Sequence, residues 1–529
     1  MKIAAALAAA SLLTAGSAQA ATYLVDTTND SDAPAFQVCD ASPMNANCSL
    51  RGALIAADAN AGSHIIQFDL STSDPGYIAS TAHWRFAPAT NYPFVTNDLV
   101  IDGYSQAGSA ANTNTPDQGG SNAVLRIEIR GPGASSQLTG LQVTNSAAAL
   151  TLRGIAISGF QANLALDTFA THHIEGCFIG TDITGMLAGD TSNGSGFGIR
   201  SSGPSVIGGV TPAARNVISG NPYLGISNSN GAALTVQGNL IGTNATGTAA
   251  LPGQDYGVFL DNLGGGGIIG GASAQARNVI SGNTFSAVYV FAQFGGANPQ
   301  ILRVLGNYFG TDVGGTQPIG NGTNPESPSQ PVSTISAFGA NRCGMEIGGT
   351  ASGEGNLIAF GGAAGVQIAS CGDTPILGNR FHRNRGVGID LSETSNADGY
   401  TPNDPGDPDG NPPPGGGSHF SSNRLQNFPE IVSLAYSNGG ATIQLSYRVD
   451  TALANATYPL RVDIGRGRGN QSEGSILTDT YPASSAQLAK TVSFPASALQ
   501  GEPLVLSVTD AAGNSSEFGG DDIFGTGFE

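Results

Sequence analysis

The densest group of ionisable side chains lies in residues 378–393, GNRFHRNRGVGIDLSE. It contains Arg380, His382, Arg383 and Asp390, in a chain with 20 Lys and Arg among 529 residues. A base beside positive charge can remove the proton next to a uronate carboxylate and stabilise the resulting anion, as a polysaccharide lyase does. His382 or Arg383 would be that base, and Asp390 would orient it or bind a metal. The alternative is a solvated basic patch in which Asp390 pairs with an arginine.

A second group of polar side chains supplies carboxylate oxygens within one loop. Residues 396–411, NADGYTPNDPGDPDGN, contain Asp398, Asp404, Asp407 and Asp409. Calcium takes six to eight oxygen ligands in loose geometry, and loops of this composition suit it. The spacing of an EF-hand is missing, because the order of acidic residues and the glutamate at the twelfth position differ. The loop is therefore a candidate site for Ca²⁺, and a plain Pro/Gly/Asp turn is the alternative.

Other polar positions repeat at fixed places, which favours a structural role. Asparagine recurs in two series, Asn216, Asn278 and Asn356, and Asn239, Asn307 and Asn379. Asparagine tolerates tight bends and satisfies the backbone groups of turns, so we expect stacked asparagines rather than a ligand groove. Asp182 and Asp312 are also equivalent and would suit the paired carboxylates of a glycosidase. The third copy of that position is Asn244, which favours turn chemistry instead.

The blocks that carry these residues define the architecture. NVISGN occupies 216–221 and again 278–283, and GCFIGTD, GNLIGTN and GNYFGTD begin at 176, 238 and 306. Both blocks first recur after the same interval, from 216 to 278 and from 176 to 238. Internal periodicity indicates a solenoid whose units bury their apolar faces against neighbours. Short β-branched runs bounded by Gly, Asn and Asp predict strands closed by turns, in coils of about 21 residues, three to a repeat.

Helical periodicity is absent between residues 100 and 395, and the 77 glycines suit a chain that turns every few residues. The repeats, the string CSLRGAL at 48–54 and the segment GVGIDLS…TPNDPGD…LQNFPEI at 386–431 resemble secreted bacterial right-handed parallel β-helix proteins with a CSLREA-type N-terminal motif. The resemblance implies an all-β fold and export, but no particular activity. Gly52 stands where that family commonly has an acidic residue.

The ends of the chain predict export and two further units. Residues 1–20 have the charged start, short apolar stretch and Ala-Gln-Ala ending of a signal peptide. Residues 21–68 would form an N-terminal cap, with a helix over 49–60 that starts at Ser49. The β-helix would cover 69–430 and an antiparallel Ig-like β-sandwich 431–520, followed by a short acidic-aromatic tail at 521–529.

The five cysteines fit an exported chain. Cys39 and Cys48 lie close together in one loop, and we expect a disulfide between them. Cys343 and Cys371 could meet on adjacent coils. Cys177 stands where the repeat elsewhere has asparagine, and we expect a buried free thiol in a stacked row.

Two functions of different classes remain. The formal charge of −19 disfavours nucleic acid and acidic membranes as partners, and no apolar run is long enough to span a membrane. We expect an exported, non-catalytic rod that displays loops to a polysaccharide or a cell-surface glycan. Tyr223, Tyr256, Tyr289 and Tyr308 are candidates to line one side of it. The alternative is a polysaccharide lyase or glycoside hydrolase of the pectate-lyase-like β-helix type, and neither the ligand nor the oligomeric state follows from the sequence.

Overall fold

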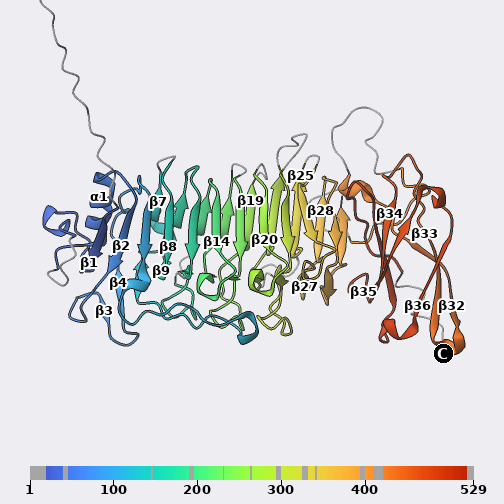
Figure 1. Ribbon diagram of the computed structural model, residues 1–529, viewed down its shortest axis with the longest axis horizontal. Coiled ribbons are helices and arrows are strands. Elements are labelled where there is room, and N and C mark those ends of the chain that lie inside the picture. Colours follow the sequence, from blue (N-terminus) through green and yellow to red (C-terminus); the bar gives the residue numbers. More distant parts are fainter. Residues whose placement is uncertain are drawn as a thin grey trace, which may run out of the picture.

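A computed structural model of the protein shows a long rod of short strands that ends in a smaller β-domain (Figure 1). It describes residues 20–39, 46–144, 147–189, 196–229, 232–261, 265–292, 300–323, 332–339, 342–392, 399–408 and 421–520. The predicted signal peptide, apart from Ala20, and the tail at 521–529 lie outside these residues.

The rod consists of three long sheets of parallel strands. The first sheet contains β1 (Thr22–Val25), β2 (His64–Phe68), β5 (Leu99–Asp102), β8 (Leu150–Arg153), β11 (His172–Glu175), β14 (Ser205–Gly208), β17 (Leu234–Gln237), β20 (Gly267–Gly270), β23 (Leu302–Leu305), β26 (Met345–Gly348) and β29 (Ile376–Leu377). The second sheet contains β3 (Tyr77–Ile78), β4 (His83–Phe86), β6 (Ile127–Arg130), β9 (Ile155–Ser158), β12 (Phe178–Ile179), β15 (Val217–Ile218), β18 (Leu240–Ile241), β21 (Val279–Ile280), β24 (Tyr308–Phe309), β27 (Leu357–Ala359) and β30 (Arg380–His382). The third sheet contains β7 (Thr139–Val143), β10 (Ala162–Leu166), β13 (Phe197–Ser201), β16 (Leu224–Asn228), β19 (Tyr256–Asp261), β22 (Val288–Ala292), β25 (Ile335–Gly339), β28 (Val366–Ala369) and β31 (Ile389–Ser392).

From β5 to β31 the chain visits the first, second and third sheets in the same order in every coil. This is the predicted right-handed parallel β-helix. Only β3 and β4 pair antiparallel within the three sheets as described. Alternate residues of each strand point inward, so that Ile226, Val258 and Val288 align on neighbouring strands and are fully buried. Along each strand, the residues that alternate with these inward-facing side chains point outward.

The coils are longer than the sequence suggested. Val217 and Leu240 are paired neighbours in the second sheet, and the asparagines that precede them, Asn216 and Asn239, lie 23 residues apart. The next coil, from Asn239 to Asn278, takes 39 residues. The repeat from Asn216 to Asn278 therefore contains two coils rather than three. The error arose because NVISGN and GNLIGTN occupy the same strand position in alternate coils, and the turn after GNLIGTN lengthens every second coil.

The same alternation merges the two predicted asparagine series into one ladder. Its members, in order along the rod, are Asn216, Asn239, Asn278, Asn307, Asn356 and Asn379. Each amide Nδ2 donates to Oδ1 of the next member at 2.8–3.1 Å. Because these side chains are buried, the ladder satisfies polar groups that would otherwise be costly. The structural interpretation of the asparagines is thus confirmed.

Cys177 occupies the N-terminal end of this ladder, as predicted. Its backbone N–H donates to Asn216 Oδ1 at 2.8 Å, and its thiol is fully buried and free. Burial raises the pKa of the Cys177 thiol to about 12. The predicted disulfides Cys39–Cys48 and Cys343–Cys371 are both present.

The N-terminal end of the rod is covered by α1 (Leu50–Ala59). Ser49 is its N-cap and accepts a hydrogen bond from Gly52 N at 2.9 Å, as the sequence predicted. The rod itself begins earlier than residue 69, because β1 and β2 are the first two strands of the first sheet. In the described part of the chain, no helix is long and apolar enough to cross a membrane.

The β-domain is a sandwich of two three-stranded antiparallel sheets. One contains β32 (Glu430–Ser437), β33 (Thr442–Arg448) and β36 (Lys490–Pro495), and the other β35 (Ser472–Tyr481), β34 (Leu460–Gly467) and β37 (Leu504–Thr509). The predicted antiparallel sandwich is thus present, and β32 is one of its edge strands. Ile443, Tyr447 and Leu506 belong to its buried core.

The sandwich closes the C-terminal end of the β-helix. Ser515 Oγ accepts from Ile376 N and Glu517 Oε1 from Leu391 N, each at 2.9 Å. The last coil would otherwise present unpaired strand edges to solvent. The polar side chains of the sandwich therefore replace the next coil.

Candidate functional site

The structure places Arg380 and His382 at the junction between the β-helix and the sandwich. Arg380 Nε lies 3.1 Å from Glu473 Oε2, and His382 Nδ1 lies 2.5 Å from Glu473 Oε1. Both residues lie on the outer side of β30, with the buried Phe381 between them. One carboxylate of the sandwich thus binds both side chains, which holds the two parts of the chain together.

The other two catalytic candidates lie in different environments. Arg383 is exposed in the turn that follows β30, where its φ is 53°. Asp390 lies on β31 in the third sheet and is 1% exposed, and Gly399 N donates to its Oδ2 at 3.2 Å. A lyase needs its base and its positive charge in one groove. Within the described residues, Asp390 does not share a groove with Arg380 and His382, because it is buried on another sheet.

Asp390 instead lies near a second buried carboxyl group, Glu517 of the sandwich. Glu517 accepts hydrogen bonds from Leu391 N and Thr401 N. Burial, together with the negative charge of Asp390, raises the pKa of Glu517 to about 8, and those hydrogen bonds oppose the rise. Two acidic side chains thus lie near each other at the junction, and the charge state of Glu517 affects its stability.

A cleft of about 520 Å³ lies between the last coils and the sandwich. Its charged lining residues are Arg380, Arg461, Asp463 and Glu473. Arg461 binds Asp463 through two hydrogen bonds of 2.8 Å, and Arg380 binds Glu473. Since these four charges pair with one another, the described lining of the cleft offers no free charge to an ionic ligand.

The predicted calcium loop is only partly covered by the described residues. Asp398 and Asp409 lie outside them. Asp407 is 2% exposed, and its Oδ2 accepts hydrogen bonds from Gln426 Nε2 and Thr451 Oγ1, both at 2.7 Å. Asp404 lies on the same loop, where its backbone pairs with the side chain of Asn427. Among the described residues, no group of three or more His, Cys, Asp or Glu side chains is arranged to hold a metal.

The equivalent Asp182 and Asp312 act as turn residues. Asp182 Oδ1 accepts from the backbone N–H groups of Met186 and Leu187, and Asp312 Oδ1 from those of Thr316 and Gln317. Asn244 does the same one repeat along. These carboxylates close a loop and are not paired across a groove.

The third sheet carries an outward-facing row of aromatic side chains. Phe259 and Tyr289 are register partners on β19 and β22, and their rings stack with centroids 5.1 Å apart and planes 5° apart. Further contacts of 5.2–6.2 Å join the other members. The aromatic row, as we use the term, consists of Phe197, Tyr223, Tyr256, Phe259, Phe285, Tyr289 and Phe338.

All seven side chains of the aromatic row are half-buried. Their rings contact one another along the rod, with two pairs stacked and the others tilted or edge-to-face, and each ring keeps part of its area in solvent. Burial, and then the neighbouring Tyr289, raises the pKa of Tyr256 to about 12, so its hydroxyl stays protonated and can donate a hydrogen bond. The surface thus combines apolar ring edges with hydroxyl donors.

Over the middle coils, the outer face of the second sheet is different, because loops cover it. Phe178, Val217, Leu240 and Val279 point outward there but are buried in a separate apolar cluster. In the third sheet the aromatic row keeps part of its area in solvent, beside the more exposed Phe291. Partly exposed apolar side chains gathered on one face of a rod mark a binding surface more often than isolated ones do.

Of the four tyrosines predicted to line one side, three do so. Tyr223, Tyr256 and Tyr289 belong to the aromatic row, whereas Tyr308 lies on β24 in the second sheet beneath Arg277, which is 4.1 Å from its ring centroid. The phenylalanines of the row were missed. Their outward position could have been found only from the alternation of each strand, which requires the strand register.

The comparison with protein-family models gives no match, and neither does the comparison with curated proteins. The functional argument therefore depends on the fold and on the surfaces described above.

Proposed function

We propose that the protein is an exported, non-catalytic β-helix rod that binds a polysaccharide along the aromatic row. The observation that carries this proposal is the continuous run of contacting, half-buried rings over neighbouring strands of the third sheet. Sugars present apolar C–H faces and many hydroxyl groups. An aromatic edge with adjacent tyrosine hydroxyls offers contacts to both kinds of group.

The geometry suits an extended ligand rather than a small molecule. Neighbouring parallel strands lie about 4.8 Å apart, so the row repeats its contacts at that interval along the rod. Repeated weak contacts add up along a polymer that occupies them together. A polysaccharide chain that lies parallel to the rod axis can contact several coils at once.

Binding is favoured over catalysis because of where the candidate catalytic residues lie. Arg380 and His382 are bound to Glu473, and Asp390 is buried on another sheet. A lyase or hydrolase of the pectate-lyase-like type is the alternative. It predicts unsaturated or reducing sugar release that depends on His382 or Arg383.

Export is part of the proposal. The signal-like residues 1–20, the CSLRGAL and repeat motifs, and the two disulfides support it. On the same motifs we infer membership of the CSLREA-type β-helix proteins. N-terminal sequencing of the protein from culture medium should give a chain that starts at Ala21, and a cytoplasmic chain that keeps Met1 would contradict export.

The binding test uses the double variant Phe259→Ser with Tyr289→Ser. Serine suits both positions because Ser227 and Ser336 already occupy the same register on the flanking strands. The matched control is Phe169→Ala, which removes an 82% exposed ring from outside the row.

Affinity electrophoresis against a panel of neutral polysaccharides, followed by calorimetry, would measure binding. We expect the double variant to lose about tenfold or more in affinity for whichever glycan binds, and the control to bind normally. Equal binding by the double variant would reject the aromatic row as the site.

A further inference from the structure

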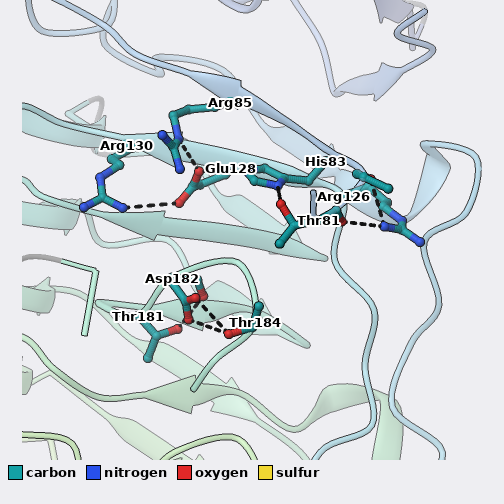
Figure 2. A network of polar contacts seen from close by, with 10 residues as sticks. Thr81, His83, Arg85, Arg126, Glu128, Arg130, Thr181, Asp182 and Thr184 are labelled. Carbon is teal, nitrogen blue, oxygen red and sulfur yellow. Dashed lines mark hydrogen bonds and ion pairs between the residues drawn. The ribbon is translucent and has the colours of Figure 1, made fainter. Parts of the chain in front are cut away.

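A separate polar network lies on the outer face of the second sheet, near the N-terminal end of the rod (Figure 2). Glu128 on β6 is at its centre and is 1% exposed. Its Oε2 accepts from Arg85 Nε at 2.5 Å and lies 3.0 Å from His83 Nε2. Arg130 Nη1 is 3.8 Å from the other oxygen, Oε1, which is too far for a hydrogen bond.

The network has an excess of positive charge. Arg126 directly precedes β6 and donates to the carbonyl oxygens of Thr81, Ala82 and Gly108. Burial by itself would raise the pKa of Glu128, but the hydrogen bonds from His83 and Arg85 outweigh it, and the pKa lies below its ordinary value. The carboxylate is therefore charged, and three arginines stand against one glutamate.

This local excess of positive charge contrasts with the net charge of the chain, which is −19. Two arginines of the first sheet, by contrast, each have a carboxylate partner that they share with no second arginine: Arg153 binds Asp102 at 2.8 Å, and Arg303 binds Glu346 at 2.9 Å. Here Arg85 and Arg130 share a single glutamate. A structural ion pair needs one arginine for Glu128, so the second guanidinium is left without a full counter-charge.

The terminal N–H groups of Arg85 and Arg130 are the unused donors. In the described residues, Arg85 donates only through Nε, and Arg130 has only its 3.8 Å contact. Both side chains are more than a third exposed, at 37% and 38%. Both guanidinium groups thus reach solvent, and both approach the buried Glu128 carboxylate, at 2.5 and 3.8 Å.

We propose that Arg85 and Arg130 form an anion-binding site for the carboxylate or sulfate groups of an acidic polysaccharide. Guanidinium groups bind such oxyanions through two parallel hydrogen bonds, more specifically than an ammonium does. The site is an open surface, so it fits a group that projects from a polymer. It is distinct from the aromatic row, and either site can fail its test without the other.

The test measures binding of the mature, full-length protein to dextran sulfate, to polygalacturonate and to neutral dextran at low salt. We expect tighter binding to one or both anionic polymers than to dextran, and the stronger of the two identifies the preferred group. The double variant Arg85→Gln with Arg130→Gln should lose about tenfold in that affinity. The matched control, Arg153→Gln with Arg303→Gln, removes the same charge and should stay close to the parent.

Equal losses in the two double variants would reject the site in favour of non-specific attraction, as would equal binding of charged and neutral polymers. A second measurement needs no variant. Phenylglyoxal modifies accessible arginines, and peptide mass spectrometry can locate them. The bound anionic polymer should protect Arg85 and Arg130 but not Arg153, and modification of Arg85 and Arg130 that is unchanged by the polymer would overturn the proposal.

Discussion

Asn384 of the last coil and Gln471 of the sandwich are hydrogen-bonded in the manner of two successive coils. The backbone N and Nδ2 of Asn384 both donate to Gln471 Oε1, at 2.9 and 3.1 Å. The members of the asparagine ladder use the same two donors toward the next Oδ1, as Asn278 does toward Asn307. The sandwich is thus a continuation of the stack and not a module on a linker.

Replacing Gln471 by alanine should weaken the junction. The side chain also donates to the carbonyl oxygens of Asn384 and Gly386, so the variant leaves buried groups without partners. We expect a loss of about 2–4 kcal/mol in the free energy of unfolding. Hydrogen–deuterium exchange should accelerate in β30 and β31. Gln444→Ala, on the exposed side of β33, is the control, and equal exchange in both variants would argue against the junction as a stabilising contact.

Cys177 should be chemically silent in the folded protein. With its pKa raised to about 12 by burial, the thiol stays protonated at neutral pH and is out of reach of Ellman's reagent. When the protein is unfolded without reductant, one thiol per chain should react with the reagent. Cys177→Asn should retain or raise the unfolding temperature, because an amide can donate to Asn216 as the other ladder members do. Rapid labelling of the native chain would contradict this environment.

The junction should lose stability as the pH rises. The folded-state pKa of Glu517, about 8, lies above its ordinary value of 4.5. The stability that this group contributes is therefore full below 4.5 and is lost as the pH rises through about 8. The Tm of the parent should fall across this interval more steeply than that of Glu517→Gln, which cannot ionise. If the Tm of the parent and that of Glu517→Gln fell with pH at the same rate, the pKa of Glu517 would not be raised by burial.

His172 should act in the opposite direction. Its ring is fully buried, Nδ1 accepts from Leu150 N, and Nε2 contacts Thr168 Oγ1. Burial, with the neighbouring His173, lowers its pKa from 6.5 to about 4, so its contribution is full above 6.5 and is lost as the pH falls through about 4. His172→Gln should flatten the acid side of the Tm curve. His173→Gln, at the exposed neighbour, removes only the smaller of the two causes and should flatten the curve much less.

Asp407 should stabilise the protein without calcium. Asp407→Asn places an amide against the donors Gln426 Nε2 and Thr451 Oγ1, and we expect a loss of about 1–3 kcal/mol with or without a chelator. Asp404→Asn on the same loop is the comparison. If calcium raises the Tm of the parent and both variants abolish that gain, the loop is a calcium site after all.

The fold was predictable because its signal is local. Each NVISGN and GNLIGTN block carries its own strand, its turn and its ladder asparagine, so Asn216 and Asn239 could be found from the sequence alone. The coil length was not, since it depends on the loops between blocks. Strand pairing alone shows that Val217 and Leu240 are neighbours one coil apart.

The surfaces were harder to predict because their members are distant in sequence. Arg85 and Glu128 are 43 residues apart, and His382 and Glu473 are 91 apart. The density of charge around Arg380 was visible, but its partner was not, because Glu473 belongs to the sandwich. A cluster within one short segment therefore proved a poor guide to which side chains meet.

The pairing of one short and one long coil gives the rod a natural unit of length. Asn216 and Asn278 stand at equivalent rungs, separated by one coil of each kind. Excising residues 217–278 would join two like strands, keep the alternation and leave the ladder unbroken, whereas removal of a single coil would place two coils of the same kind together. Such a chain can therefore gain or lose two coils at a time, while the helical cap at one end and the sandwich at the other stay unchanged.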